Sequence, residues 1–434
     1  MDFMNYLLQI WKSKDLRKKI LFTLGILVIF RILAQITIPG ANTESLKLIF
    51  QQNQLLGTFS LLTGGSAENF SIILMGLSPY INASIILQLL TVIIPSMEAL
   101  SKEGDQGRRK INQYTRWLTV PIAFLQSYGM IALLNSQSPV PIVENIGQPT
   151  VILPIMLTVA TGSILLMWLG ELITEKGIGN GVSLLIFAGI VASIPQIIAQ
   201  NLALIERSTD QLVPFVIGLI ITIALAIIVM LITEGVRNIP ITYAGRGVRA
   251  KGVESSLPLR VNQAGMIPII FGISVVSFPG LLASFLQNSG DEGLRNFGSF
   301  LSSNFHDQSA TYIIVYFLIV IAFTYFYVSI TFNPEQVAEN IQKRGGYIPG
   351  IRPGKETAQY LSNVSNRLNL WGGLFIGFIA ISPLLLSILF VSLNLGAVTM
   401  ILSGAGLIIV VGVVLEILRQ INAQLVMHDY NKLY

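Results

Sequence analysis

The sequence of 434 residues contains no cysteine and only two histidines, His306 and His428. Without cysteine the chain forms neither a disulfide framework nor a thiolate metal site, although this does not identify its compartment. The sequence also lacks an HExxH motif, a nucleophile elbow and a phosphate loop, so metal-hydrolase and Ser-His chemistry lack their parts. We therefore expect a protein that is not an enzyme, with no catalytic residue, no metal and no cofactor.

Charged residues are scarce as well, at 11% of the chain, whereas 53% of the residues are hydrophobic. This composition lies far outside that of a soluble globular domain. Ten apolar stretches approach the roughly 20 residues that cross a bilayer as a helix. They are residues 20–38, 70–94, 117–134, 151–172, 182–200, 213–233, 264–286, 312–332, 370–393 and 397–418. The sequence therefore predicts an all-α polytopic membrane protein with ten transmembrane helices.

The ten spans divide into two groups of five, which is compatible with an inverted repeat, a common plan for membrane conduits. Residues 20–200 would form the first half and residues 213–418 the second, joined by an external hinge loop at 201–212. Residues 1–19 carry apolar and basic residues that favour a short interfacial helix, and 419–434 form a tail. No cleavage site follows the first span, so we expect it to be retained.

Basic residues predict the orientation of the chain. The loops after spans 1, 3, 5, 7 and 9 contain only Lys47, Arg207 and Arg295, and Arg31 lies inside the first span. All the other Lys and Arg residues fall on the opposite side, which the positive-inside rule makes cytoplasmic, together with both termini. The net charge of +5 therefore reflects topology, and we expect no DNA partner.

Two large cytosolic loops, 234–263 and 333–369, are predicted. The second begins NPEQVAENIQKRGGYIPGIRPG, in which Gly345-Gly346 and Pro353-Gly354 predict turns and Arg352 precedes a proline, which favours extended backbone. Lys343, Arg344, Arg352 and Lys355 would present cations to an anionic partner. On charge alone, the simpler interpretation is a loop that only orients its flanking helices.

This string resembles the large cytosolic loop of the SecY family, whose members form the pore of a protein-translocation channel. GLSPYINASIILQLLT in the second span and SLPLRVNQAG before the seventh resemble the same family. The likeness extends over essentially all spans and fits the C-terminal tail loosely. It implies a channel that translocates unfolded secretory polypeptides and releases hydrophobic segments laterally into the membrane, built from two pseudo-symmetric five-helix halves.

A secondary transporter of a small solute is the alternative, because inverted repeats suit it equally well. Transporters driven by ion gradients normally bury carboxylates near the membrane midplane, whereas the acidic residues here cluster in loops and at span ends. The SecY-like interpretation implies the partners SecE, SecG, the SecA ATPase, ribosomes, precursors bearing signal sequences, and membrane lipids. It also implies a location in the cell membrane.

Residues 55–68, LLGTFSLLTGGSAE, are apolar but too short to span. As a helix they would cover roughly 21 Å, less than the ~30 Å hydrocarbon core. The segment is either an interfacial element or a re-entrant one surrounded by protein or a water-filled cavity. The resemblance implies a re-entrant plug that closes the resting pore, with Gly57, Thr58, Phe59, Ser60, Leu61, Leu62, Thr63, Gly64 and Gly65 at its centre.

Isoleucines four residues apart share one helix face in span 2, at Ile81 and Ile85, and in span 5, at Ile186 and Ile190. Taken alone, such pairs face lipid or pack against neighbouring helices. The resemblance implies a constriction ring made of Ile81, Ile85, Ile186, Ile190, Ile270 and Ile409. Branched aliphatic side chains offer ions no hydrogen bonds, so a ring of them seals the pore yet adapts to any passing side chain.

Three uncharged polar residues, Thr91, Gln126 and Asn262, lie in or beside apolar spans. Singly, each is typical of a hydrogen-bond partner between packed helices. The resemblance implies that they line a lateral gate, where spans 2 and 3 meet spans 7 and 8. It also implies that Arg246, Arg249 and Lys251 in the loop 234–263 join Lys343, Arg344, Arg352 and Lys355 as contacts for the motor or the ribosome.

Overall fold

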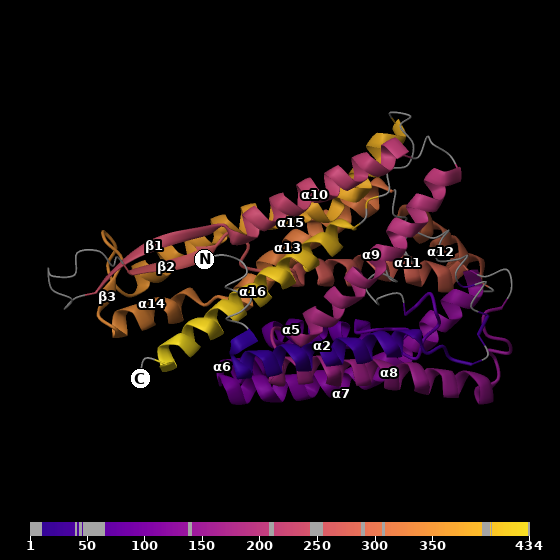
Figure 1. The fold of residues 1–434 in the computed structure, drawn as a ribbon, viewed down its shortest axis with the longest axis horizontal. Helices are drawn as coiled ribbons and strands as arrows, with labels where there is room; N and C mark the ends of the chain where they lie inside the picture. Colours follow the sequence, from indigo (N-terminus) through magenta and orange to yellow (C-terminus); the bar gives the residue numbers. More distant parts are fainter. Residues whose placement is uncertain are drawn as a thin grey trace.

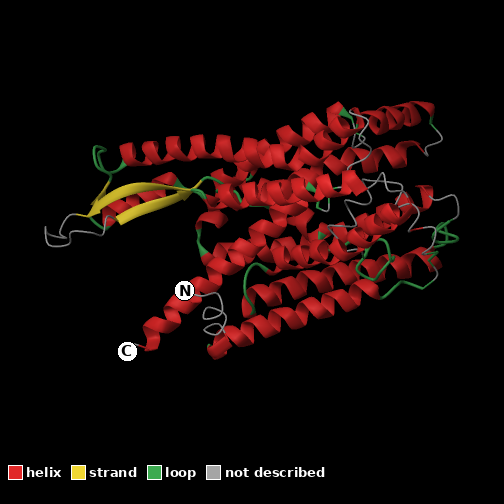
Figure 2. Cartoon of the chain, turned by 45° about the horizontal axis from the view of Figure 1, so that its top comes forward, coloured by secondary structure: helices red, strands yellow, loops and turns green. Residues whose placement is uncertain are grey.

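The computed structural model describes residues 11–39, 41–42, 46, 66–137, 141–207, 212–243, 255–287, 291–305, 309–392, 400 and 402–432. Helices make up most of this part of the chain, as Figure 2 shows, and confirm the helical fold that the sequence predicts. A three-stranded antiparallel sheet at one end was not predicted.

The first half contains helices that follow the first five predicted spans, and the second half contains those that follow the other five. Those of the first half are α2 (Lys14–Gln35), α5 (Ser78–Ile93), α7 (Asp105–Gln137), α8 (Pro149–Lys176) and α9 (Gly181–Arg207), with a short helix α6 (Pro95–Lys102) after α5. Those of the second half are α10 (Leu212–Glu234), α11 (Ile267–Gln287), α13 (Ala310–Thr331), α15 (Lys355–Ser392) and α16 (Gly404–Lys432), with α12 (Glu292–Asn304) and α14 (Pro334–Lys343) between them. Helices suit these apolar sequences because lipid offers the backbone no hydrogen bonds, so each segment must satisfy its own.

Seven helices of the described residues are long and apolar enough to cross a membrane, and the bent pair α5 and α6 raises the count to eight. The other two predicted spans coincide with α2, of 22 residues, and α11, of 21 residues. The structure thus places a helix on each of the ten predicted stretches. The count of ten crossing helices stays a prediction for α2 and α11.

The second predicted span, 70–94, was wrong as one continuous helix. Turns occupy residues 66–77 apart from a bridge at Ser71, and Phe70 and Gly76 have positive φ values of 46° and 54°. Helix α5 begins only at Ser78, with Pro79 in its first turn. At the other end Ile94 is extended because Pro95 follows it, and α6 departs at 105°.

Four contacts between helices recur in the two halves. In the first half α5 contacts α7, α7 contacts α8, α8 contacts α9, and α2 contacts α9. In the second half α11 contacts α13, α13 contacts α15, α15 contacts α16, and α10 contacts α16. Figure 1 shows α2, α5, α7 and α8 on one side of the molecule and α10, α13, α15 and α16 on the other. This repetition supports the pseudo-symmetric plan that the resemblance implies.

The contacts between the two halves include three pairs of helices. On one side α9 packs against α16, and on the other α11 packs against α5 and α7. A hydrophobic cluster lies between them and draws buried residues from both halves, such as Leu166 and Leu185 of the first and Ile376 and Leu407 of the second. The core of the bundle is therefore shared between the halves.

The two predicted cytosolic loops form one folded unit at the end of the bundle shown on the left of Figure 1. Strand β1 (Val236–Tyr243) pairs with β2 (Ser255–Arg260), and its far end pairs with β3 (Gly346–Tyr347). Because β3 belongs to the second loop, this sheet ties the loops together. Their shared core contains Ile239, Ile241, Leu259, Ala338, Ile341, Ile348, Leu361 and Val364.

Helix α14 occupies the first part of the second predicted loop, 333–369. The side-chain oxygen of Asn333 accepts hydrogen bonds from the backbone nitrogens of Glu335 and Gln336 at 3.1 and 3.2 Å. Pro334 follows at the first helical position, where its missing N–H costs no hydrogen bond. The sequence NPEQ is therefore a helix start, which the sequence analysis missed.

Candidate functional site

The predicted ring isoleucines come from four helices, α5, α9, α11 and α16. Five of them belong to or contact the cluster shared by the two halves: Ile186, Ile190, Ile270 and Ile409 are buried in it, and Ile81 packs against it. Ile85 lies one turn after Ile81 and is only 5% exposed, but it is outside that cluster. The fold therefore brings together residues that are more than 300 positions apart in the sequence.

Ile190 lies close to the first turn of α16. A Cβ atom added to Gly406, in the first turn of α16, would lie 3.6 Å from Cγ2 of Ile190. Ile186 stands one turn earlier on the same face of α9, and Ile409 lies three residues after Gly406. These side chains are aliphatic and buried, as a closed hydrophobic constriction requires and as an ordinary core also shows. Their pore role stays a prediction.

The predicted gate residues lie on or just before helices that contact one another, α5, α7 and α11. Thr91 on α5 and Asn262, just before α11, are 7% and 6% exposed. Their hydrogen bonds are local: the Thr91 hydroxyl donates to the Gln88 carbonyl at 2.7 Å, and Oδ1 of Asn262 accepts from the Gly265 nitrogen at 2.8 Å. Oε1 of Gln126 on α7 is buried without a hydrogen-bond partner. Among the described residues, no hydrogen bond joins these three side chains.

A polar contact that the sequence analysis missed lies between α15 and the segment before α11. The Ser365 hydroxyl donates to Oε1 of Gln263 at 3.0 Å, and the amide of Asn369 approaches Ser365 Oγ at 3.5 Å. A Cβ atom added to Gly372 would lie 2.7 Å from the Val261 carbonyl oxygen, so the backbones are close here. The signal in the sequence is the pair Ser365 and Asn369, four residues apart on one helix face. This contact fixes the start of α11 against α15.

The predicted docking cations that the structure describes are all exposed: Lys343, Arg344, Arg352 and Lys355. The fold positions them through Ile348, which is 2% exposed and inserts into the shared core of the unit that the two predicted cytosolic loops form. Gly345 and Gly354 take φ values of 68° and 100°, which confirms the predicted turns on either side. The cations therefore sit on a folded surface rather than on a slack loop.

Two of these cations have contacts of their own in this unit. Lys343 forms an ion pair with Glu339 at 2.7 Å, between side chains that are 68% and 60% exposed. Such an exposed pair contributes about 0–1 kcal/mol. The backbone carbonyl of Arg352 accepts a hydrogen bond from the Thr357 hydroxyl at 2.9 Å. The guanidinium of Arg352 takes no part in this bond.

A groove of about 860 Å³ lies between α14 and the start of α15. Asn333, Glu335, Glu339, Gln342 and Lys355 are among its lining residues. It lies within the same unit as the exposed cations. The sequence does not indicate this groove, because the β3 turn separates the two segments that form its walls.

The other predicted site residues lie outside the described residues. These are the plug positions Gly57, Thr58, Phe59, Ser60, Leu61, Leu62, Thr63, Gly64 and Gly65, and the docking candidates Arg246, Arg249 and Lys251.

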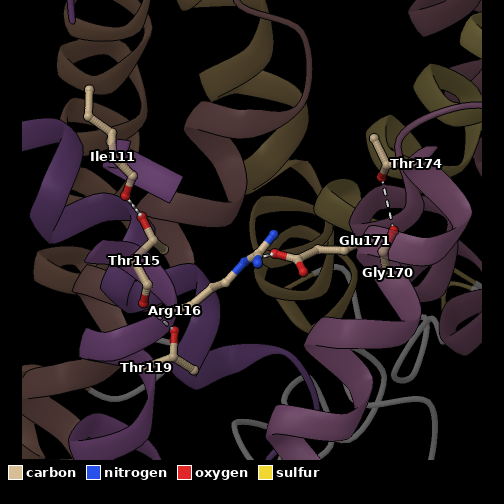
Figure 3. Close-up of polar contacts among 7 residues, drawn as sticks. All are labelled: Ile111, Thr115, Arg116, Thr119, Gly170, Glu171 and Thr174. Atoms are coloured by element: carbon tan, nitrogen blue, oxygen red, sulfur yellow. Dashed lines mark hydrogen bonds and ion pairs between the residues drawn. The ribbon is translucent and has the colours of Figure 1, made fainter. Parts of the chain in front are cut away.

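Two ion pairs between neighbouring helices were also missed. Figure 3 shows Arg116 of α7 reaching Glu171 of α8, with Nε 2.6 Å from Oε1. In the same view Thr115, Thr119 and Thr174 each donate to a carbonyl of their own helix. Arg419 of α16 pairs with Glu234 of α10 at 2.6 Å. Each pair joins two helices of the same half, so neither crosses the boundary where the halves meet.

Comparison with known proteins gives a consistent result. A family model described as SecY matches residues 71–418. The protein translocase subunit SecY of Streptomyces scabiei is 41% identical over 438 residues, which cover 97% of each chain. The solved structure described as "The structure of a protein conducting channel" has a TM-score of 0.65 at 20% identity, covering 95% of this chain and 93% of that one. Sec61 in the canine ribosome-channel complex from the endoplasmic reticulum gives 0.63 at 20% identity, with the same coverage of 95% and 93%.

Proposed function

Because the chain belongs to the SecY family, we infer that it is a protein-conducting channel of the membrane and not an enzyme. The observation that carries this inference is the match to a translocase subunit over 97% of both chains. It agrees with the two-half architecture described above. The alternative, a secondary transporter of a small solute, receives no support from these comparisons.

The substrate of the channel is an unfolded secretory polypeptide that bears a signal sequence. During passage the polypeptide is surrounded by a ring made of Ile81, Ile85, Ile186, Ile190, Ile270 and Ile409. At rest the same ring seals the pore, in series with the plug at 55–68. Four of these isoleucines, Ile186, Ile190, Ile270 and Ile409, are buried in the cluster that both halves share, and Ile81 packs against it, which supports the proposal. Aliphatic side chains offer no hydrogen bond to ions, and a narrow apolar passage dewets.

Hydrophobic segments leave sideways, between α11 on one half and α5 and α7 on the other. This boundary is the proposed lateral gate, and Thr91, Gln126 and Asn262 are its polar residues. The contacts of α11 with both helices support the proposal. Opening requires α11 to move, so the hydrogen bonds of Asn262 with Gly265 and of Gln263 with Ser365 would set how readily its first turn shifts.

The cytosolic unit receives the partner that drives translocation, either the SecA ATPase or a translating ribosome. Its exposed cations Lys343, Arg344, Arg352 and Lys355 suit an anionic partner surface, and Arg246, Arg249 and Lys251 belong to the same unit by sequence. The fold likeness to Sec61 in a ribosome-channel complex is consistent with this role. SecE and SecG complete the channel in the cell membrane, with both termini of this chain in the cytoplasm.

Uptake of a precursor into vesicles tests the channel function. The chain, co-purified with its small subunits, is reconstituted and supplied with SecA and ATP, and protease-protected precursor is measured. Protection that requires both the chain and ATP is expected. Uptake of small solutes without any precursor protection would refute the channel.

The Arg352→Glu variant tests the docking role in the same vesicles. Charge reversal meets a complementary anionic surface, so precursor uptake should fall steeply while membrane insertion is normal. Arg352→Lys keeps the charge and is the matched control, with activity near that of the parent. Normal uptake by Arg352→Glu would remove the docking role of this residue but leave the channel function intact.

A further inference from the structure

Helix α12 (Glu292–Asn304) lies between α11 and α13, at the end of the molecule opposite the sheet (Figure 1). The carboxylate of Asp291 caps it by accepting from the Gly293 nitrogen at 2.8 Å. Gly298 and Leu301 are buried on one side. A Cβ atom added to Gly298 would lie 2.9 Å from the Leu286 Cβ, so this side packs tightly on the end of α11.

The apolar surface of α12 is wider than the part that packs. Three large apolar side chains are exposed on it: Leu294 at 45%, Phe297 at 51% and Phe300 at 59%. This exposure forgoes the stabilisation that such side chains gain when they are buried away from water. At 3.6 residues per turn these three share a flank with Gly298 and Leu301. The opposite flank is polar and contains Glu292, Arg295, Asn296, Ser299, Ser302 and Ser303. The helix is therefore amphipathic with an uncovered apolar flank.

The neighbouring helices also expose apolar side chains. On α11, Phe278 and Leu282 are 62% and 36% exposed, and on α13 Ile314 and Leu318 are each 57% exposed. In a membrane-spanning helix, such outward apolar side chains face lipid acyl chains. Helix α12 packs on α11 and contacts α13, so it lies beside two helices that expose apolar side chains.

We propose that Leu294, Phe297 and Phe300 form a lipid-contact surface by which α12 inserts its apolar flank among acyl chains at the membrane border, with the polar flank toward water. Through Gly298 and Leu301 this anchors the end of α11. Since α11 contacts α5 and α7 of the other half, the lipid layer at this border would then act on the boundary between the halves. The proposal requires only that the bundle spans a membrane, and it stands apart from the transport function.

Single-cysteine spin labelling tests this proposal, and the chain offers a background without cysteine. Nitroxides are placed at Phe297→Cys and Phe300→Cys on the apolar flank, and at Asn296→Cys and Ser299→Cys on the polar flank. The full chain with its co-purifying subunits is reconstituted into phosphatidylcholine and phosphatidylglycerol vesicles. Collision rates with oxygen, which concentrates in lipid, and with a water-soluble nickel chelate are measured for each label.

The ratio of oxygen to nickel collisions should be several-fold higher at Phe297 and Phe300 than at Asn296 and Ser299. Equal ratios at the four positions would overturn the proposal, because α12 would then be in water. Shielding of the Phe297 and Phe300 labels from both reagents would also overturn it, since a protein partner or a second copy would cover the flank. Quenching of a bimane label at Phe300→Cys by brominated acyl chains gives an independent reading, and no quenching counts against lipid contact.

Discussion

Replacing Ile190 with alanine separates a pore ring from an ordinary hydrophobic core. Ile190 is 1% exposed and packs against the first turn of α16. Ile190→Ala removes three buried carbon atoms, and a loss of this size costs about 2–5 kcal/mol of stability. If the residue lines the constriction, the space gained also widens and hydrates the passage. The resting channel should then conduct ions, and more so when Ile186→Ala is added.

Two control variants make this prediction specific. Ile190→Leu conserves the side-chain volume, should cost less than about 1.5 kcal/mol, and should keep the seal. Ile173→Ala on α8 alters a residue of the same cluster that is 0% exposed but is not a predicted ring position. It should destabilise the protein by a comparable amount without any leak.

Single-channel conductance in planar bilayers gives the leak, and thermal unfolding of the purified complex in detergent gives the stability. A leak at rest for Ile190→Ala, with silent Ile190→Leu and Ile173→Ala, is expected. If Ile190→Ala is as silent as Ile173→Ala while it still transports precursor, Ile190 is a core residue. The ring would then have to be built from other side chains.

Three further substitutions test the proposed cytosolic unit, the proposed gate and an ion pair. Ile348→Ala should lower the free energy of unfolding by about 2–5 kcal/mol and speed tryptic cleavage of the unit. The control Tyr347→Ala, at a residue that is 40% exposed, should do neither. Equal cleavage rates for the two variants would contradict the shared core. Asn262→Leu removes the acceptor for the Gly265 nitrogen and should shift the balance between closed and open gate by about 1 kcal/mol. The readout is altered export of precursors with weakened signal sequences. Unchanged export of precursors with weak and strong signals alike would make Asn262 a packing residue. Glu171→Gln breaks the ion pair with Arg116 and should lower the unfolding free energy by no more than about 1 kcal/mol. The control Arg116→Gln breaks the same pair. A fall in the unfolding temperature that is much larger for Glu171→Gln than for Arg116→Gln would show that Glu171 has another role.

The positions of the helices were largely predictable from the sequence. An apolar run of about 20 residues identifies a span wherever it occurs, because lipid removes water as a backbone partner. The failures were local. Pro79, Gly76 and Pro95 shorten and bend the second span, and the prediction by length ignored them. The helix α14 was missed although Asn333 and Pro334 signal its start.

The candidate site depended more on tertiary structure. The spacing of Ile186 and Ile190 shows that they share a face, but many apolar residues of the spans satisfy the same pattern. Only the packing of α9 on α16 selects the face that meets Gly406 and lies near Ile409. The ion pairs of Arg116 with Glu171 and of Arg419 with Glu234 join residues 55 and 185 positions apart, which the sequence cannot match.

The sequence by itself determined the class of this protein: a chain that is 53% hydrophobic, with long apolar runs and basic residues gathered on one side, belongs in a membrane. These are local properties, since each span satisfies its own backbone. The tertiary structure decided which of these spans touch, that β3 of the second cytosolic loop completes the sheet of the first, and that α12 leaves an apolar flank uncovered. Contacts between distant segments arise from the complementary shapes of packed side chains, and the order of apolar residues along one segment does not specify its partner.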